Sequence, residues 1–582
     1  MKQRGPRMCI RAAGIALGLG LFAVSLKSGD LPLGFQRLGL LQFSEFRAIL
    51  RISGLGLVVA FTIGDLIDRS VRKILGSIDG WLLQSERRST AALILLIAAY
   101  TITYSGVTFY RHYSFNSTGF DLAILDQAIW NTAQGRPFAR SIYGIESQLG
   151  AHIRPYIALL SLPYIVFPSP YILLAFQSLV LALTAWPLYR LSKRRLNSPA
   201  MGLVIAFCGL AYPPLGFLNR FDFHPEVVAV PLLAAAYERL DASDLKGTLI
   251  LAGLALFAKE DIGVTVAALG LLIALRYKRW FLGSLSAVVS LTYSAVALLV
   301  IIPFFRGEPS HALSRYAWLG DTVGEMLLTM FSRPGFVLGN VIEARRITTF
   351  LQLLAPLAFL PILGWSALIV AVPALTYNYL AQHFCQPTIY CHYMAPVIPF
   401  ILISSVLGLS ILTSSLWGRR VLGWMTNQSD HPEQGIGIGI SIIVLATFAS
   451  WTYQSPVADN SFASPAFRVQ SNSSAIREGL GYVPDDVDVA TTNAYAPHLS
   501  HRNELEILMY GRIFDDEAEL FFLNLRDLRW TMSCADYREC LEQAADSGFG
   551  VTFYKDGVVV VRKHAGNHGR LRDLLSDWPG CE

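Results

Sequence analysis

Long apolar stretches recur along the first 450 residues of this chain, and they constrain its fold more than any other feature. Runs of membrane-spanning length, such as Ile10 to Leu26, Leu50 to Ile67 and Ala91 to Tyr110, continue to about Trp451. A helix needs about 20 apolar residues to cross a bilayer. Only 15% of the 582 residues are charged, against roughly 25% in ordinary soluble proteins. The sequence therefore predicts a polytopic α-helical membrane protein with roughly 11–13 spans, and it excludes a disordered chain, a coiled coil or a simple soluble enzyme.

Basic clusters between the apolar runs orient the spans. These clusters lie at residues 69–73 with Arg87 and Arg88, at 193–195, at 276–279 and at 419–420. Positive residues in short loops stay on the cytoplasmic side. This places loop 111–153 outside, and it makes the small net charge of +5 a signal of topology and not of nucleic-acid binding. Segment 155–166 is too short for a sure crossing, and we expect it to be partly inserted.

The composition changes from Ser455 onward, where no apolar run of membrane length remains. Segments 487–491 and 507–510 are predicted to be strands, and segment 517–528 a helix. Segments 550–554 and 558–562 are predicted to form a hairpin closed at Asp556-Gly557, a favoured tight-turn pair. We therefore expect three parts: extra membrane helices in residues 1–90, a membrane domain in 91–454, and a small extracytoplasmic α/β domain in 455–582.

Many ionisable residues lie at the ends of the apolar runs, where charge is costly unless it faces a cavity or a partner. They are Asp121, Asp126, His152, Arg154, Asp222, His224, Glu226, Lys259, Glu260, Asp261, His311, Arg315, His383 and His392. The topology drawn from the basic loops places all of them on the outer side. This convergence predicts a functional site at the outer edge of the membrane.

Asp121 and Asp126 belong to an amphipathic segment of the first outer loop. Its apolar residues Leu122, Leu125 and Ile129 recur at helical spacing, which predicts a helix lying at the membrane interface. Asp121 either caps this helix, whose dipole favours an acid in the first turn, or acts as a base or metal ligand above a membrane cavity. The five-residue spacing places the two acids on different faces, so we expect them to have different roles.

Two further clusters carry charge at the membrane edge. Phe221 to Glu226 holds Asp222, His224 and Glu226 at alternate positions, which suits metal binding or proton handling as well as a solvated, capped loop. Lys259-Glu260-Asp261 separates two apolar runs that are each too short for a full crossing, which predicts a broken, partly re-entrant hairpin. The triplet is either a self-neutralising turn or a phosphate site in which the lysine acts as a point charge.

The cysteines offer two pairs with the same spacing. Cys385 and Cys391 lie in an outer loop, and Cys534 and Cys540 lie in the tail. Local disulfides are expected for both pairs in an oxidising compartment, with free thiols as the alternative. Neither pair has the close spacing of a zinc site.

Several motifs follow one another in an order that resembles a known family. They are Phe120 to Ala133, Gly135 to Phe138, Leu149 to Pro155, Phe167 to Pro170, Phe221 to Glu226, Lys259 to Asp261, His392-Tyr393 and Asn493 to Arg502. This pattern is similar to the family of prokaryotic multipass membrane proteins called domain of unknown function 2079. The resemblance covers roughly Ala91 to Lys563.

That family itself resembles the GT-C class of glycosyltransferases, which use polyprenyl-phosphate sugars. The resemblance implies a GT-C-like membrane domain and transfer of a sugar from such a donor to an acceptor on the outer face of the prokaryotic plasma membrane. By position, Asp121 matches the acidic residue of the first outer loop that serves as base or metal ligand in that class. Asp126 is the second catalytic candidate.

The other candidates are assigned from charge and position. Those expected to bind substrate or phosphate are His152, Arg154, Lys259, Glu260, Asp261, Arg315 and His392. Asp222, His224 and Glu226 are the candidates to hold a divalent metal ion, and His498 and Arg502 of the tail would close over the site or bind acceptor. The expected partners are a lipid-linked sugar donor and membrane lipids, with no nucleic acid and no prediction of the oligomeric state.

The same charged cavity also suits a transporter or a lipid-handling protein. Two features favour the enzyme: the charges gather on one side, and no matched pair of broken helices is evident in the two halves of the sequence.

Overall fold

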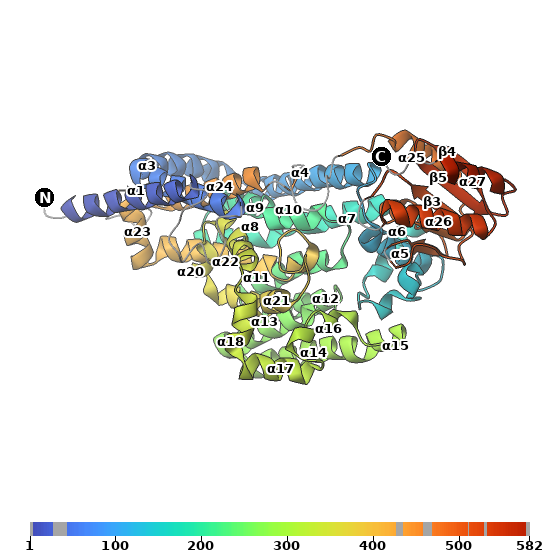
Figure 1. The fold of residues 1–582 in the computed structure, drawn as a ribbon. Helices are drawn as coiled ribbons and strands as arrows, with labels where there is room; N and C mark the ends of the chain where they lie inside the picture. The colour runs from blue at the N-terminus through green and yellow to red at the C-terminus, as the bar shows by residue number, and fades with distance from the viewer. Residues whose placement is uncertain are drawn as a thin grey trace.

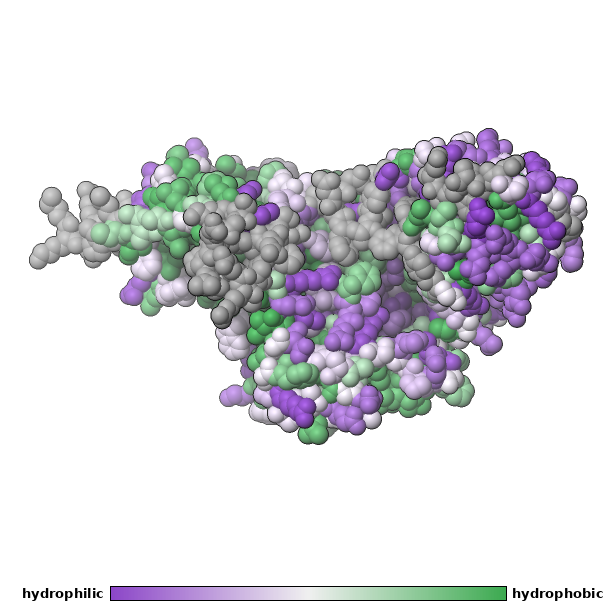
Figure 2. All heavy atoms as spheres, in the orientation of Figure 1, coloured by the Kyte–Doolittle hydropathy of each residue, from purple (hydrophilic) through white to green (hydrophobic). Residues whose placement is uncertain are grey.

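The computed structural model describes residues 4–26, 44–426, 435–454, 456–457, 468–509, 511–528 and 532–577. The helices form an elongated body, with the N-terminus at one end and a small sheet-containing domain at the other (Figure 1). In the space-filling view, hydrophilic side chains gather over the C-terminal domain, while hydrophobic ones are frequent on the helices (Figure 2).

The N-terminal helices pack closely against the rest of the bundle. Helix α1 (Arg4–Leu26) lies against α3 (Ser44–Leu82), and α3 also contacts α24 (Ile436–Tyr453). A Cβ atom added at Gly18 would lie 2.6 Å from the Gly54 carbonyl oxygen, so the small residues allow the two helices their close approach. The buried carboxylate of Asp68 on α3 accepts hydrogen bonds from the amides of Gly435 and Ile438 at the start of α24. It thereby satisfies helix-terminal amides that would otherwise be unpaired in the interior.

The remaining helices of the membrane region follow in chain order. They are α4 (Glu86–Tyr113), α5 (Ile124–Ala133), α6 (Ile157–Val166), α7 (Pro170–Ala182), α8 (Ala185–Leu196), α9 (Pro199–Leu210), α10 (Pro213–Arg220), α11 (Ala229–Asp241), α12 (Leu245–Leu256), α13 (Ile262–Tyr277), α14 (Trp280–Val296), α15 (Ile302–Arg306), α16 (His311–Ser314), α17 (Val323–Ser332), α18 (Pro334–Val341), α19 (Ala344–Leu354), α20 (Leu360–Leu363), α21 (Trp365–Leu380), α22 (Ile398–Ser414) and α23 (Leu416–Thr426).

By length and composition, the described residues contain six helices able to cross a membrane, or up to eight if each of two bent pairs counts as one span. The bent pairs are α9 with α10, at 49°, and α22 with α23, at 78°. Five shorter apolar helices, of 10–17 residues, come in addition. The architecture is therefore that of a polytopic helical membrane protein, while the predicted 11–13 spans would require most of the short helices to cross as well.

Two local predictions are confirmed. The amphipathic segment of the first loop is helical, as a π-helical turn, η2 (Gly119–Ala123), that continues into α5. The apolar face formed by Leu122, Leu125 and Ile129 packs against α6 and α7. Helices α12 and α13 end and begin on either side of Lys259-Glu260-Asp261, so the charged triplet does interrupt an apolar hairpin.

The C-terminal domain is a five-stranded mixed sheet of order β2-β1-β3-β5-β4. Its strands are β1 (Val489–Thr491), β2 (Leu505–Ile507), β3 (Leu520–Asn524), β4 (Phe549–Lys555) and β5 (Val558–Lys563). Helices α25 (Ser473–Leu480), α26 (Cys534–Asp546) and α27 (His568–Asp577) complete the domain. Strand β1 pairs in parallel with β2 and β3, and β4 and β5 form the predicted hairpin with Asp556-Gly557 in its turn.

The predicted helix over 517–528 is wrong, because this segment contains the central strand β3. Leu520 and Phe522 lie in one hydrophobic cluster, while Phe521 and Leu523 lie in another, on the opposite face of the sheet. A strand covered on both faces carries a continuous apolar run without alternation, which periodicity does not distinguish from a helix.

One of the two expected disulfides is formed. Cys385 and Cys391 are bonded to each other, whereas Cys540 is a buried free thiol and Cys534 is bonded to another cysteine. The prediction of a Cys534–Cys540 bond is wrong because both residues lie on α26. Six helical positions separate Cα atoms by about 9 Å along the axis, beyond the ~7 Å that a disulfide spans.

Candidate functional site

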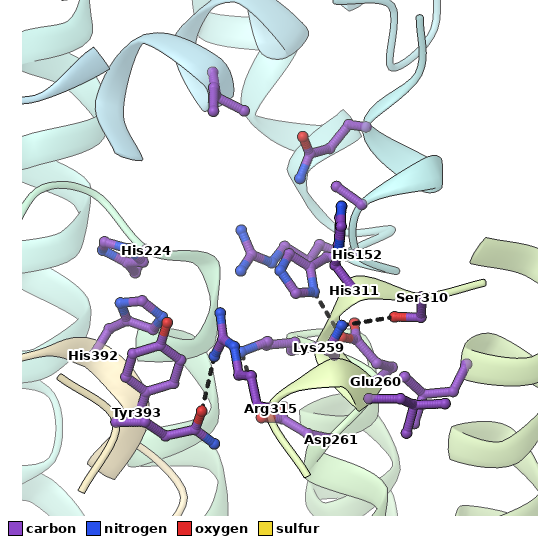
Figure 3. A pocket seen from close by; sticks show the side chains of 18 of the residues that line it. His152, His224, Lys259, Glu260, Asp261, Ser310, His311, Arg315, His392 and Tyr393 are labelled. Atoms are coloured by element: carbon purple, nitrogen blue, oxygen red, sulfur yellow. Dashed lines mark hydrogen bonds and ion pairs between the residues drawn. The ribbon is translucent and has the colours of Figure 1, made fainter. Parts of the chain in front are cut away.

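One cavity of about 460 Å³ collects most of the ionisable residues singled out from the sequence (Figure 3). Its wall is built from the first loop, the turn after α10, the break between α12 and α13, and the segments that carry Arg315 and His392. The sequence candidates that line it are Asp121, His152, Arg154, His224, Lys259, Glu260, Asp261, His311, Arg315 and His392. Residues that lie more than 270 positions apart in the sequence thus meet at one site.

The lining of the cavity is cationic. Five arginine and lysine residues, Arg140, Arg154, Lys259, Arg306 and Arg315, face three carboxylates, Asp121, Glu260 and Asp261. Glu226 and Glu308, which do not line the cavity, pair with Arg154, Lys259 and Arg306. Arg140 and Arg315 are left without an ion pair among the described residues, and two such guanidinium groups in one cavity favour an anionic ligand.

Asp121 lies in the π-helical turn at the start of the loop helix, where one wall of the cavity begins. Its Oδ2 lies 3.0 Å from the Thr118 hydroxyl oxygen, and its Oδ1 lies 3.1 Å from Nε2 of His224. Burial would raise the pKa of Asp121, but the hydrogen bond and charge of His224 outweigh it, and the pKa lies below its ordinary value. The side chain is 23% exposed, so an ionised carboxylate is accessible from the cavity.

Hydrogen bonding determines the orientation of His224. Its Nδ1 lies 2.7 Å from the backbone carbonyl oxygen of Asp222, which can only accept a hydrogen bond. Nδ1 therefore carries a proton, and Nε2 is the atom directed toward Asp121. The Asp222 carboxylate is ion-paired with Arg111 and accepts hydrogen bonds from the amide and hydroxyl of Thr118. Asp222 is thus committed to positioning the loop, and it does not line the cavity.

Glu226 joins the cations beneath the cavity. It is 2% exposed, and its carboxylate lies 3.3 Å from Lys259 Nζ, 3.4 Å from Arg154 and 3.4 Å from His392 Nε2. Burial would raise the pKa of Glu226, but Lys259 and Arg154 hold it well below its ordinary value. This buried carboxylate brings three distant segments together, because each cation would be costly to bury without it.

The broken hairpin contributes a second buried carboxylate, which is held by hydrogen bonds. Glu260 accepts hydrogen bonds from His152 Nδ1 at 2.7 Å and from the amide of Ile153 at 3.0 Å. Burial opposes the charged carboxylate, but His152 and Lys259 hold the pKa of Glu260 at about 2. Burial lowers the pKa of His152 to about 4, so a neutral imidazole donates to an ionised carboxylate at neutral pH.

Asp121, His224 and His392 form a candidate metal site. One ligand atom from each lies within 4.8 Å of the others. The rings of His224 and His392 stack with centroids 3.8 Å apart, and Nδ1 of His392 is buried without a hydrogen-bond partner among the described residues. Burial and the neighbouring His224 keep the pKa of His392 well below its ordinary value, so the imidazole is neutral. Two imidazoles and one carboxylate suit zinc, manganese or cobalt better than calcium or magnesium.

This ligand set differs from the predicted one. Of Asp222, His224 and Glu226, only His224 belongs to the cluster, because the carboxylates of Asp222 and Glu226 are already held by Arg111 and by Arg154 with Lys259. His392 was expected to bind substrate, and its place next to His224 appears only in the tertiary structure.

Asp126 lies outside the cavity, on the other face of the loop helix. It is fully buried and accepts hydrogen bonds from the hydroxyls of Tyr164 and Ser500, and its Oδ2 lies 2.8 Å from His501 Nε2. The two acids of the first loop do have different surroundings, as their spacing predicted. Asp126 joins the loop to the C-terminal domain, and the catalytic role expected for it has no support in this position.

The tail motif contacts the first loop and not the cavity. Asn493 accepts hydrogen bonds from the amides of Gly119 and Phe120 through its carbonyl and side-chain oxygens, at 2.7 and 3.1 Å. Arg502 donates to backbone carbonyls of Pro484, Val487 and Leu499 inside its own domain. The contacts of the tail with the first loop therefore position the helix that carries Asp121. That His498 and Arg502 close over the site or bind acceptor stays a prediction.

Several cavity residues were missed in the sequence. Arg140, Tyr143 and Gln148 from the first loop and Tyr393 beside His392 all line the cavity. Arg140 stands in an irregular loop segment, where no helical or strand periodicity marks a buried position. Tyr143 has a positive φ of 69°, a conformation that is uncommon for a non-glycine residue, and its ring stacks on Phe120 next to Asp121.

Together these features define a polytopic helical membrane protein with a cationic cavity between helix ends and an α/β domain docked beside it. The chain belongs to the family of domain of unknown function 2079 (DUF2079), described as a predicted membrane protein, whose model matches residues 111–560. This confirms the family resemblance seen in the sequence motifs. None of the curated proteins matches the chain.

Among solved structures, the chain is similar to ArnT from Cupriavidus metallidurans, crystallised bound to undecaprenyl phosphate and in the apo state. Each comparison has 11% sequence identity and a TM-score of 0.47 and covers 82% of this chain. It covers 98% of the ArnT chain in the first structure and 99% in the second. This likeness assigns no role to any residue.

Proposed function

We propose that this protein transfers a sugar from a polyprenyl-phosphate donor to an acceptor on the outer face of the membrane. The observation that carries the proposal is the accessible carboxylate of Asp121 next to His224, in one cavity with unneutralised arginine side chains. Glycosyl transfer needs an acceptor hydroxyl to be oriented and a leaving phosphate to be stabilised, and this cavity holds groups for both tasks.

Asp121 would act on the acceptor. Its depressed pKa keeps it ionised at neutral pH, so it can accept a hydrogen bond from the acceptor hydroxyl. As the new bond from the acceptor oxygen to the sugar C1 forms, the hydroxyl proton passes to the carboxylate. His224, held by the Asp222 carbonyl, keeps the carboxylate in place.

Arg315 is the best-placed residue for the leaving phosphate. Its guanidinium donates to the neutral Gln386 side chain at 2.8 Å and lies over the ring of Tyr393, 5.3 Å from its centroid. Lys259, in contrast, is neutralised by Glu226 and Asp261 at 3.3 and 3.4 Å. When the bond between C1 and the phosphate oxygen breaks, its electron pair goes to that oxygen, where a guanidinium free of acidic partners contributes most.

A divalent ion at Asp121, His224 and His392 is compatible with this scheme. Bound there, it would supply a positive charge close to the reacting oxygens. The orphaned Nδ1 of His392 and the fixed Nε2 of His224 are the features of this chain that fit such an ion.

The prenyl chain of the donor would lie against the apolar part of the wall. Val264 on α13 and Leu298, in the π-helical turn after α14, line the cavity beside its polar groups. A lipid phosphate has a charged head and an apolar tail, and a cavity that joins both kinds of surface at the membrane edge suits it.

The proposal is tested with purified protein in liposomes and radiolabelled polyprenyl-phosphate sugars. Asp121→Asn keeps the shape of the side chain and removes its charge, and we expect transfer to fall by at least 10²-fold, a typical contribution of a general base. Asp321→Asn, an exposed acid in another loop, serves as the matched control and should leave transfer unchanged. Undiminished transfer by Asp121→Asn would remove Asp121 from the mechanism.

Transport is the second candidate function, because the membrane region contains broken apolar helices of the kind that bind substrate in transporters. The two bent pairs found in the described residues differ in where they bend. The pair of α9 and α10 leads directly to Asp222 and His224, whereas α22 and α23 bend at Ser415, next to the basic residues Arg419 and Arg420. Binding of a polyprenyl-phosphate sugar without transfer by the wild type, followed by its movement between leaflets, would favour transport.

A further inference from the structure

Arg140 is a buried cation whose guanidinium forms no ion pair with any described residue. Its side chain is 6% exposed, and its Nε has no hydrogen-bond acceptor in the described part of the chain. No ion pair joins it to an acid within the described ranges. The groups that act on it electrostatically include two further cations, Arg154 and Arg306, and one acid, Glu506. Such a group is costly to bury unless it receives a counter-charge, so its place on the cavity wall needs an explanation.

Orphaned polar atoms surround Arg140 on the same wall. Gln148 is 1% exposed with its Oε1 unpaired, and Arg154 has an unpaired Nε although it contacts Glu226 on its other side. The Glu506 carboxylate in β2 attracts Arg140 electrostatically, but its ion pair, at 3.1 Å, is with Arg512. Buried polar atoms are almost always satisfied in folded proteins, and a group of them around one cavity wall indicates that a ligand completes the set.

We propose that Arg140 and Arg154 bind an oxyanion, a phosphate or a carboxylate, carried by the acceptor, and that Gln148 accepts a hydrogen bond from a hydroxyl of the same molecule. This rests on the proposed function, which it deepens by making the acceptor an acidic saccharide or phosphorylated molecule. A planar guanidinium matches either oxyanion in a two-pronged manner. The unpaired Oε1 of Gln148 is an acceptor, and a saccharide hydroxyl beside the anionic group can donate to it.

The side of the cavity assigns this subsite to the acceptor and not to the donor. Arg140, Tyr143 and Gln148 belong to the same outer loop as Asp121, and the ring of Tyr143 stacks on Phe120. The acceptor hydroxyl has to reach Asp121, so the rest of the acceptor lies along this loop. Arg315 and Tyr393 come from other segments and contact each other, so they leave a separate cationic position for the donor phosphate.

The inference is tested by binding, without any sugar transfer. The full chain in lipid nanodiscs is titrated calorimetrically with methyl phosphate and with glucuronate, and with methyl glucoside as a neutral control. We expect the wild type to bind one of the two anions and not the glucoside, which identifies the acceptor's acidic group as phosphate or carboxylate. Arg140→Gln should weaken that binding at least tenfold, and Arg526→Gln, an exposed arginine paired with Asp556, should not.

Two further readouts separate this inference from the proposed function and from a folding defect. Arg140→Gln should still bind a polyprenyl phosphate like the wild type, because the donor position is elsewhere; failure of the wild type to bind polyprenyl phosphate would contradict the proposed donor while leaving the anion site standing. Arg140→Gln should also melt at a higher temperature than the wild type, since it removes an unpaired buried charge. Anion binding by Arg140→Gln equal to that of the wild type, or a lowered melting temperature, would overturn the inference.

Discussion

Substitution of Asp126 by alanine should release the C-terminal domain from the first loop. The carboxylate is fully buried and is shared by Tyr164 of α6 and by Ser500 and His501 of the tail. Burial would lower the pKa of His501, but Asp126 outweighs it and raises this pKa above its ordinary value. Alanine would leave three polar partners facing an empty position. Removing one partner of a buried, hydrogen-bonded charge pair costs about 3–5 kcal/mol.

Hydrogen exchange measures this cost at the contact itself. The amides of Gly119 and Phe120 donate to Asn493 across the boundary between loop and tail, so they exchange when the two parts separate. At about 1.4 kcal/mol for each factor of ten, their protection should fall by roughly two to three and a half powers of ten in Asp126→Ala.

The control is Asp556→Ala in the hairpin turn. Asp556 is 40% exposed in its pair with Arg526, and exposed pairs contribute about 1 kcal/mol or less. Unchanged protection of the Gly119 and Phe120 amides in Asp126→Ala would show that the buried carboxylate does not hold the C-terminal domain against the first loop. Asp126 would then again be a candidate catalytic residue.

Three further predictions concern the docked domain and the metal site. Gly119→Ala should cost about 1–3 kcal/mol by overpacking, because the added Cβ would lie 2.5 Å from the Ile507 Cδ1 atom; a lower melting temperature than that of Gly106→Ala, where the space is open, checks this. Burial, together with Arg477, lowers the pKa of His498 to about 4, so its contribution to docking is complete above pH 6.5 and is lost as the pH falls toward 4. Amide exchange at Gly119 between pH 7 and 4 should show this loss in the wild type and less of it in His498→Phe. Zinc or manganese should raise the melting temperature of the wild type and not of His392→Ala, and an equal rise in both would exclude His392 as a ligand.

The predictions that succeeded relied on local pattern and charge. Helical spacing of Leu122, Leu125 and Ile129 was sufficient for the loop helix, and two short apolar runs were sufficient for the interruption at Lys259-Glu260-Asp261. Both patterns follow from the periodicity of a helix and the thickness of a bilayer, which act on neighbouring residues. The ordered series of motifs likewise indicated the family that the match over residues 111–560 confirms.

The predictions that failed required knowledge of what covers a segment. Segment 520–524 is a strand with an apolar cluster on each of its faces. Its continuous apolar sequence has no periodicity that distinguishes it from a buried helix. The Cys534–Cys540 pairing failed because the intervening residues are helical. In both cases the outcome depends on how the segment packs against the rest of its domain, which the residues of the segment do not specify.

The sequence alone determined that this chain is a membrane protein and that its titratable groups lie at the ends of apolar helices. Both follow from the length of apolar runs and the charge of loops, which are properties of contiguous segments. Which of those groups share a cavity was decided by tertiary packing. The carboxylates of Asp222 and Asp126 are paired with side chains of other segments, Arg111 and His501. His392 and Arg140 line the same cavity as Asp121. Electrostatic pairing between distant side chains depends on distances of a few ångströms, and only the folded arrangement of the helices sets them.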